Sequence, residues 1–77
     1  MELNIKCFAG NTHKIIVNSN CTVYNLKKLI EKEEGISPEQ QKLVFMGKIL
    51  NDNNALLTDL NIKNTYCIHL AIALRGG

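Results

Sequence analysis

One segment limits the fold of this chain more than any other, because it has the spacing of an amphipathic helix. Over residues 23–34 apolar side chains such as Leu26 recur every three or four positions, and lysines such as Lys27 fall mostly on the opposite side. Thr22 is placed to cap the start of this helix, and Gly35 is placed to end it in the left-handed conformation. A chain with one helix among short strands is expected to fold as a sheet that the helix covers on one face.

Five short segments around the helix alternate between apolar and polar residues, which is the pattern of half-buried strands. They cover residues 1–7, 12–17, 40–45, 48–50 and 66–72. Gly10 and the pair Met46-Gly47 supply turns between them. Because one helix cannot cover both faces of five strands, we expect an α+β domain with one face of its sheet exposed, where a binding function would lie.

The charge of the chain argues against a nucleic-acid or membrane partner. The 77 residues carry a net charge of +2, and the lysines are spread along the sequence without a basic stripe interleaved with aromatic residues. No apolar run is long enough to span a bilayer, and the first residues alternate as a strand does instead of forming a signal peptide. We therefore expect a cytoplasmic and nuclear protein that binds neither nucleic acid nor membrane.

The three cysteines, Cys7, Cys21 and Cys67, fit neither a disulfide framework nor a zinc motif, because their number is odd and no Cys-x-x-Cys spacing occurs. We expect reduced thiols that serve as small side chains. His13 would face inward with the apolar residues of its strand, and no second ligand-type residue has suitable spacing from it. The sequence therefore predicts no bound metal.

An enzymatic role would need a nucleophile, a base and a pocket. Cys67 and His69 are two residues apart, and on a strand they would share a face. The sequence offers no third orienting group and no pocket, so we expect that the protein is not an enzyme and has no catalytic residues.

Several stretches, in the same order along the whole chain, resemble the ubiquitin family. They are Met1 with Lys6 and Gly10, "TVYNLKKLIEKEEGI" from 22 to 36, "PEQQKLVFMGKIL" from 38 to 50, "LTDLNI" from 57 to 62, "IHL" from 68 to 70, and "LRGG" at the end. The resemblance implies a ubiquitin-like β-grasp fold, in which a mixed five-stranded sheet packs on one α-helix. It also implies a domain over residues 1–72 followed by a flexible conjugation tail over residues 73–77.

Two positions indicate the Nedd/Rub type of modifier within this family. Ala73 stands where ubiquitin itself has arginine and where Nedd/Rub modifiers have alanine, and Asn51 is also the Nedd-like choice. An arginine at position 73 would bring a charge that one activating enzyme can pair with and another can reject. Ala73 is therefore the residue expected to select the activating enzyme.

The resemblance assigns the chemistry to the end of the tail. The carboxylate of Gly77 would be adenylated with ATP, passed between enzyme cysteines as a thioester, and joined to a lysine by an isopeptide bond. Gly76 and Gly77 lack a Cβ and could pass through a narrow channel. Arg75 could bind an acidic groove, and Leu74 could anchor in an apolar pocket. The activating enzyme would consume the ATP, so no cofactor is expected to stay bound.

Two apolar surfaces are expected to bind partners, again by resemblance. The first patch comprises Phe8, Val44, His69 and Ala71. The second patch, nearer the tail, comprises Ile36, Ile72 and Leu74. Phe8, Val44 and Ala71 replace the leucine, isoleucine and valine of ubiquitin, which gives more apolar area at position 8 and less at the other two. Lys48, on an exposed short strand, is a candidate isopeptide acceptor.

The resemblance also implies a monomer that several proteins bind in turn. These are Nedd-type activating and conjugating enzymes, cullin subunits of ubiquitin ligases as the main targets, deconjugating proteases, and proteins that bind the two patches. Two alternatives stay open. The chain could be a divergent ubiquitin, which loading by the two activating enzymes would reveal. It could also be a non-conjugated ubiquitin-like interaction module of a larger protein, which would keep its binding without the last two glycines.

Overall fold

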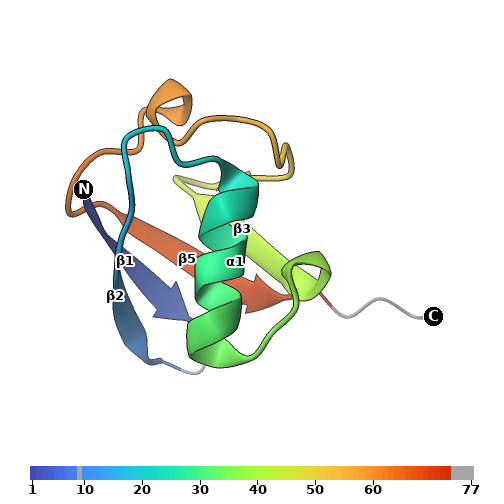
Figure 1. The fold of residues 1–77 in the computed structure, drawn as a ribbon. Helices are drawn as coiled ribbons and strands as arrows, with labels where there is room; N and C mark the ends of the chain where they lie inside the picture. Colours follow the sequence, from blue (N-terminus) through green and yellow to red (C-terminus); the bar gives the residue numbers. More distant parts are fainter. Residues whose placement is uncertain (9, 74–77) are drawn as a thin grey trace.

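The structure, a computed structural model that describes residues 1–8 and 10–73, contains a five-stranded sheet with an α-helix packed across it (Figure 1). In chain order the elements are β1 (Glu2–Cys7), β2 (Thr12–Ile16), α1 (Val23–Glu34), the short 3-10 helix η1 (Pro38–Gln40), β3 (Gln41–Phe45), β4 (Lys48–Ile49), a second 3-10 helix η2 (Thr58–Leu60) and β5 (Cys67–Ile72). The predicted α+β class and the order of the strands and the helix are confirmed.

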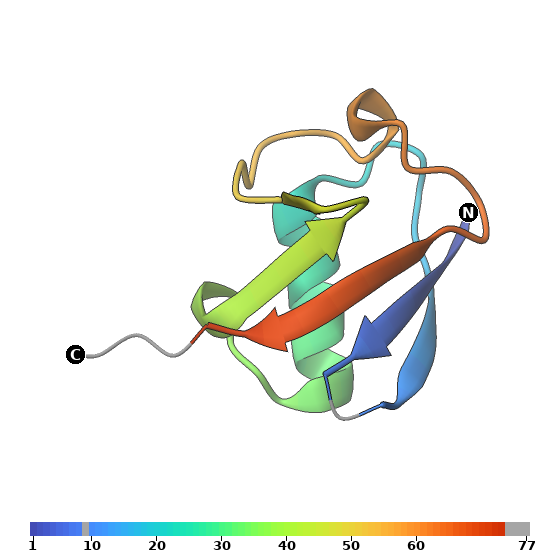
Figure 2. The same ribbon diagram turned by 180° about the vertical axis from the view of Figure 1, so that it is seen from behind.

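The strands lie in the order β2-β1-β5-β3-β4, so the last strand of the chain is in the middle of the sheet. β1 and β5 are parallel and the other neighbours are antiparallel, which makes the sheet mixed. α1 covers one face of this sheet, the inner face. Figure 2 shows the opposite, outer face, on which no element of the described residues is packed. This is the β-grasp arrangement that the resemblance implied.

The two ends of α1 are capped by the residues that the sequence indicated. The Thr22 hydroxyl accepts a hydrogen bond from the backbone N–H of Asn25 at 3.1 Å, which satisfies one of the free donors of the first turn. Gly35 ends the helix with φ 73°, and its N–H donates to the Glu31 carbonyl at 2.8 Å. Within the described residues, no helix has both the length and the apolar composition that crossing a membrane requires.

Lys27 does not lie on the polar side of α1, because its side chain is only 8% exposed. Its Nζ donates to Oδ1 of Asn53 at 3.1 Å, and its backbone carbonyl accepts a hydrogen bond from Nε2 of Gln41 at 2.8 Å. Burial lowers the pKa of the Lys27 amine, because desolvation disfavours the charged form. The expectation of an outward lysine is wrong at this position, since helical spacing cannot reveal that the loop carrying Asn53 folds over it.

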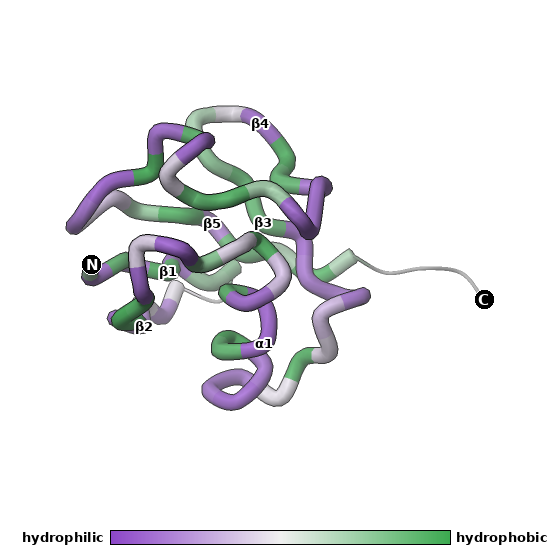
Figure 3. Tube along the Cα trace, turned by 45° about the horizontal axis from the view of Figure 1, so that its top comes forward, coloured by the Kyte–Doolittle hydropathy of each residue, from purple (hydrophilic) through white to green (hydrophobic). Residues whose placement is uncertain are grey.

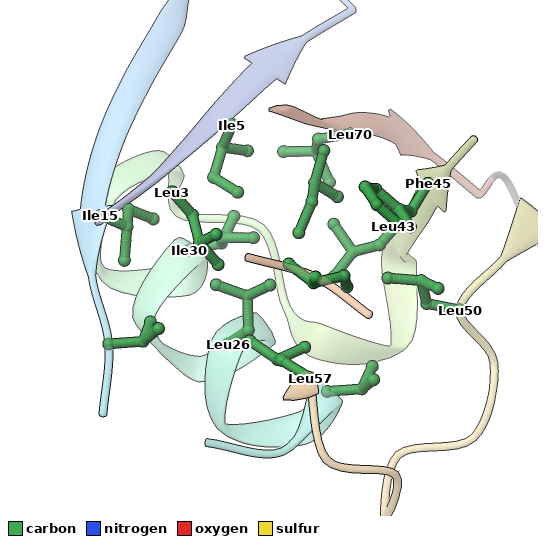
Figure 4. Packing of buried hydrophobic residues seen from close by; sticks show 14 of the residues in the cluster. Leu3, Ile5, Ile15, Leu26, Ile30, Leu43, Phe45, Leu50, Leu57 and Leu70 are labelled. Carbon is green, nitrogen blue, oxygen red and sulfur yellow. The ribbon is translucent and has the colours of Figure 1, made fainter. Parts of the chain in front are cut away.

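The core lies between the inner face of the sheet and α1, where the side chains labelled in Figure 4 converge. Its largest fully buried members are Leu3, Ile5, Leu26, Ile30, Leu43, Leu57, Ile62, Ile68 and Val23. Figure 3 shows α1 changing between hydrophilic and hydrophobic segments along its length, as an amphipathic helix does. Cys7 and Cys21 belong to this core, whereas Cys67 is exposed.

The turn between β3 and β4 fixes the register at one edge of the sheet. Met46 and Gly47 have φ values of 51° and 81°, and positive φ at both central positions is characteristic of a type I′ hairpin turn. This turn pairs Val44 with Ile49. β4 ends at Ile49, before the predicted limit at residue 50, and β5 begins at Cys67, after the predicted start at residue 66.

Candidate functional site

The outer face of the sheet carries a row of side chains that crosses four strands. His69 of β5 is in register with Lys6 of β1 and with Val44 of β3. Val44 is in turn in register with Ile49 of β4. Paired residues of neighbouring strands direct their side chains to the same face. Val44 is half-buried and the other three are exposed, so the row forms a continuous surface open to a partner.

A second row beside it contains Ala71 of β5, which is in register with Lys42 of β3. Ala71 and His69 are two residues apart on the same strand and therefore share the outer face. Three members of the first patch, Val44, His69 and Ala71, thus lie side by side on this face. Lys6 and Lys42 add positive charge around the apolar centre, which favours a partner with an acidic rim.

Phe8, the fourth member of the first patch, follows the end of β1 and is 87% exposed. It lines a cavity of about 110 Å³ together with Ile36 and Ile72 of the second patch. Ile36 is half-buried and Ile72 is 50% exposed. Phe8 therefore belongs to the same surface as the described members of the second patch. Leu74, assigned to this patch from the sequence, lies outside the described residues.

Ile49 is a surface residue that the sequence analysis did not assign to either patch. It is 50% exposed, and its pairing with Val44 places it on the outer face at the edge of the sheet. The signal for it is the Met46-Gly47 dipeptide, because a two-residue hairpin loop pairs the residues on either side in a fixed register. Ile49 extends the apolar part of the outer face by one strand.

The start of the tail is attached to the sheet through Ala73. Its backbone N–H donates to the carbonyl of Gln40 at 2.7 Å, and the residue is half-buried. A side chain at position 73 is thus held directly beyond β5 by a backbone hydrogen bond. The remaining tail residues of the predicted conjugation site, Leu74, Arg75, Gly76 and Gly77, lie outside the described residues.

Lys48, the candidate isopeptide acceptor, is exposed in β4 and in register with Phe45. Its amine is therefore open to modification from solvent. Cys67 and His69 are both exposed on the outer face, as the alternation of β5 predicts. They share that face with Val44 and Ala71.

The surroundings of His13 were not foreseen from sequence spacing, because two residues that can bind metals lie beside it in the fold. His13 Nε2 is 2.9 Å from Oε2 of Glu34, and the Cys7 thiol donates a hydrogen bond to Oε1 of the same carboxylate at 3.1 Å. Burial, followed by the hydrogen bond and the charge of Glu34, raises the pKa of the Cys7 thiol from 9.0 to about 11. Sequence spacing could not reveal this cluster, since its members come from β1, from β2 and from the end of α1.

Comparison with known proteins identifies a family model and several similar proteins. Residues 3–75 match a model described as the ubiquitin family. NEDD8-like protein RUB1 of Saccharomyces cerevisiae is 35% identical over 77 residues, which covers all of this chain and 99% of that protein. Ubiquitin-like protein NEDD8 of Dictyostelium discoideum is 32% identical with the same coverage. A longer protein, the probable ubiquitin receptor RAD23 of Oryza sativa subsp. japonica, is 36% identical over 80 residues, but this chain spans 20% of it.

Proposed function

Since this chain belongs to the ubiquitin family, we propose that it is a protein modifier of the Nedd/Rub type, attached to lysines of other proteins through Gly77. The observation that carries the proposal is the similarity to NEDD8-like proteins over the full 77 residues. The sequence "LRGG" at the end supplies the residue types that such an attachment uses. In this role the chain is the substrate of other enzymes and needs no bound cofactor.

The attachment proceeds by one activation step, which forms an acyl-adenylate, followed by transfers of the Gly77 acyl group. The carboxylate attacks ATP within an activating enzyme and forms an acyl-adenylate with release of pyrophosphate. A thiolate of the activating enzyme then displaces AMP to form a thioester, and a thiolate of the conjugating enzyme displaces the first thiolate. A lysine amine of the target finally displaces the second thiolate to form an isopeptide bond. Gly76 and Gly77 leave the carbonyl carbon unobstructed because they lack a Cβ. Arg75 contributes a planar cation suited to acidic enzyme surfaces.

Ala73 selects the activating enzyme in this proposal. The hydrogen bond to Gln40 supports the idea, because it holds position 73 at a defined distance from the sheet. An enzyme that docks on the outer face would therefore meet the side chain of residue 73 at a reproducible place. The methyl group of Ala73 would fit an activating enzyme whose surface repels arginine. It lacks the positive charge that an activating enzyme with an acidic surface would bind.

The partners follow from the same assignment. The first patch, extended by Ile49, and the second patch would bind activating and conjugating enzymes, deconjugating proteases and other receptor proteins. Cullin subunits of ubiquitin ligases are the proposed main targets, and the modifier would act as a monomer in the cytoplasm and nucleus. Lys48 would be the acceptor if chains of the modifier form.

A loading assay tests the proposal. The 77-residue chain is incubated with ATP and either a Nedd-type or a ubiquitin-activating enzyme, and the thioester is measured on non-reducing gels. We expect efficient loading on the Nedd-type enzyme, and Ala73→Arg should shift the ratio of loading rates at least about tenfold towards the ubiquitin enzyme. Thr58→Arg, at an exposed position of η2, adds the same charge elsewhere and should leave the ratio unchanged. Efficient loading only on the ubiquitin enzyme would instead identify a divergent ubiquitin.

A second candidate is a non-covalent interaction module, which the similarity to the much longer RAD23 favours. Removing Gly76 and Gly77 separates the two. A modifier loses every high-mass adduct in cells when these residues are deleted, whereas a module keeps its binding and its cellular function.

A further inference from the structure

Three side chains with different ligating atoms converge at one end of the sheet. They are the thiol of Cys7 on β1, the imidazole of His13 on β2 and the carboxylate of Glu34, the last residue of α1. One ligating atom from each lies within 4.8 Å of the others. We call these three residues the Cys7 cluster.

The backbone around the Cys7 cluster holds its members close together. β1 and β2 form an antiparallel pair in which Ile5 is in register with His13, so Cys7 and His13 are diagonal neighbours on the inner face. Gly35 stops α1 directly after Glu34 and fixes the backbone position from which that carboxylate extends. Ligands on two paired strands and a capped helix are better ordered than ligands on loops.

The hydrogen bonding within the cluster leaves one ring nitrogen unsatisfied. The Glu34 carboxylate bridges the other two residues, with Oε1 accepting from Cys7 Sγ and Oε2 lying 2.9 Å from His13 Nε2. Despite that short distance, Nε2 is buried and makes no hydrogen bond of acceptable geometry with any described residue. Buried nitrogens are normally hydrogen-bonded, so Nε2, whose contact to the carboxylate is short but poorly aligned, is available to a ligand.

We propose that Cys7, His13 and Glu34 form a binding site for a divalent ion of the zinc class. Sulfur, nitrogen and oxygen donors together select zinc or a related transition metal over magnesium and calcium, which take oxygen ligands. Bond lengths of about 2.0 to 2.3 Å in a tetrahedral site separate the ligand atoms by roughly 3.3 to 3.8 Å. The 2.9 Å and 3.1 Å contacts of the cluster open to these separations through small rotations of the half-buried Glu34.

Metal binding exchanges one proton and involves no redox change. The Cys7 S–H bond breaks, the proton passes to solvent, and the thiolate binds the ion, which stays divalent. Glu34 exchanges its hydrogen bond from the thiol for a bond to the metal. The neutral ring of His13, with its proton on Nδ1, supplies the lone pair of Nε2. Water completes the fourth position. The cavity of about 110 Å³ that Cys7 and Glu34 line with Phe8 and Ile36 has room for it.

The site would connect metal binding to the apolar surface that Phe8 forms with Ile36 of the second patch. Phe8 directly follows Cys7, and Ile36 lies two positions after Glu34. A bound ion would therefore fix the two segments that carry these apolar side chains. The inference rests on the Cys7 cluster alone and holds whether or not the chain is a conjugated modifier.

Cobalt titration tests the site. The full chain, reduced with a phosphine to avoid competing thiols, is titrated with Co²⁺ alone. We expect one equivalent to bind with a thiolate-to-cobalt charge-transfer absorption, and Zn²⁺ to abolish it by displacement. Cys7→Ala should remove the absorption. His13→Gln and Glu34→Gln should each weaken binding more than about tenfold. Zn²⁺ should also raise the melting temperature of the unmodified chain, because it binds the folded state.

Cys67→Ala is the matched control, because this exposed thiol lies two residues from His69 and offers the other sulfur–imidazole pair on the sheet. It should leave the absorption and the affinity unchanged. Glu34→Gln is the ligand variant that disturbs the core least, since its side chain is only half-buried. The proposal is overturned if the folded chain shows no charge-transfer absorption. It is equally overturned if the absorption survives Cys7→Ala or Glu34→Gln at full affinity, or is lost in Cys67→Ala.

Discussion

Successive residues of β5 point alternately to the inner and the outer face of the sheet, and the two faces have different surroundings. Ile68 and Leu70 point to the inner face and are 0% and 3% exposed, whereas Cys67 and His69 point outward and are exposed. The inner residues must fill a fixed volume beneath α1. The outer residues meet only solvent or a partner. The fold is therefore determined by one half of the strand, and the other half is free to determine which proteins bind.

The loss of stability on truncating a side chain should differ most between the neighbouring residues Leu43 and Val44 of β3, which lie on opposite faces of the sheet. Leu43 is 0% exposed, and Leu43→Ala should lower the free energy of unfolding by about 2 to 5 kcal/mol through lost burial and a residual cavity. Val44→Ala, on the outer face, should cost less than about 1 kcal/mol. Urea denaturation measures both. Equal losses would show that the outer face is packed as tightly as the inner one.

Gln41 and Lys42 allow the same comparison of inner and outer face with polar side chains. Nε2 of Gln41 donates to the backbone carbonyls of Lys27 and Ile36 at 2.8 and 2.9 Å. These bonds join the start of β3 to α1 and to the residues that directly follow α1. Gln41→Leu leaves both carbonyls without this donor and should cost about 1 to 3 kcal/mol. Lys42→Ala, on the exposed outer face, is the control. A loss for Gln41→Leu no greater than that of the control would contradict the role of these bonds.

The buried thiol of Cys7 should make the stability of the fold depend on pH. The folded-state pKa of Cys7 is raised from 9.0 to about 11, so both states keep the thiol proton below pH 9 and the stabilisation is complete there. Between pH 9 and about pH 11 the unfolded chain loses that proton first, and folding stability falls by on the order of 1 to 2 kcal/mol. Denaturation at several pH values should show this fall in the unmodified chain and a smaller one in Cys7→Ala.

Cys67→Ala is the control for the pH measurement, because its thiol is exposed in the folded chain. It should keep the full decline in stability above pH 9. Alkylation at alkaline pH gives an independent readout, in which Cys67 should react well before Cys7 because thiolates are the reactive form. Faster modification of Cys7 would refute its assignment as a protonated, buried thiol.

The smallest effect on stability is expected for Ile49. Ile49→Gln should change the free energy of unfolding by less than about 0.5 kcal/mol, because the side chain lies on the outer face at the sheet edge. The same variant should weaken binding to a Nedd-type activating enzyme if the apolar surface extends to β4. A large loss of stability would instead place Ile49 in the core.

The sequence was sufficient for the fold because local signals and global arrangement agree. Thr22 and Gly35 fixed the ends of α1, and the alternation of β3 and β5 separated inner from outer residues correctly. Lys27 was misplaced because its burial depends on Asn53, which reaches it across a loop. Local patterns carry no information on such contacts.

The candidate sites were less predictable for the same reason. The sequence allowed the grouping of Val44, His69 and Ala71. The alternation of the strands predicts that their side chains share a face, and the family resemblance predicts that their strands are neighbours. Assigning Ile49 to the same surface requires the register that the β3–β4 turn imposes. Predicting the Cys7 cluster requires knowing how two strands pack against the end of α1, because no spacing rule along the chain joins residues 7, 13 and 34.

The central place of β5 also has a mechanical consequence. β5 is hydrogen-bonded to β1 on one side and to β3 on the other, and the tail leaves from its end. Hydrogen bonds between strands run across the strand direction, so a pull along β5 shears two rows of bonds together, whereas a pull along an edge strand shears only one row. A load applied through the tail would therefore act on the strand that is best anchored against extraction.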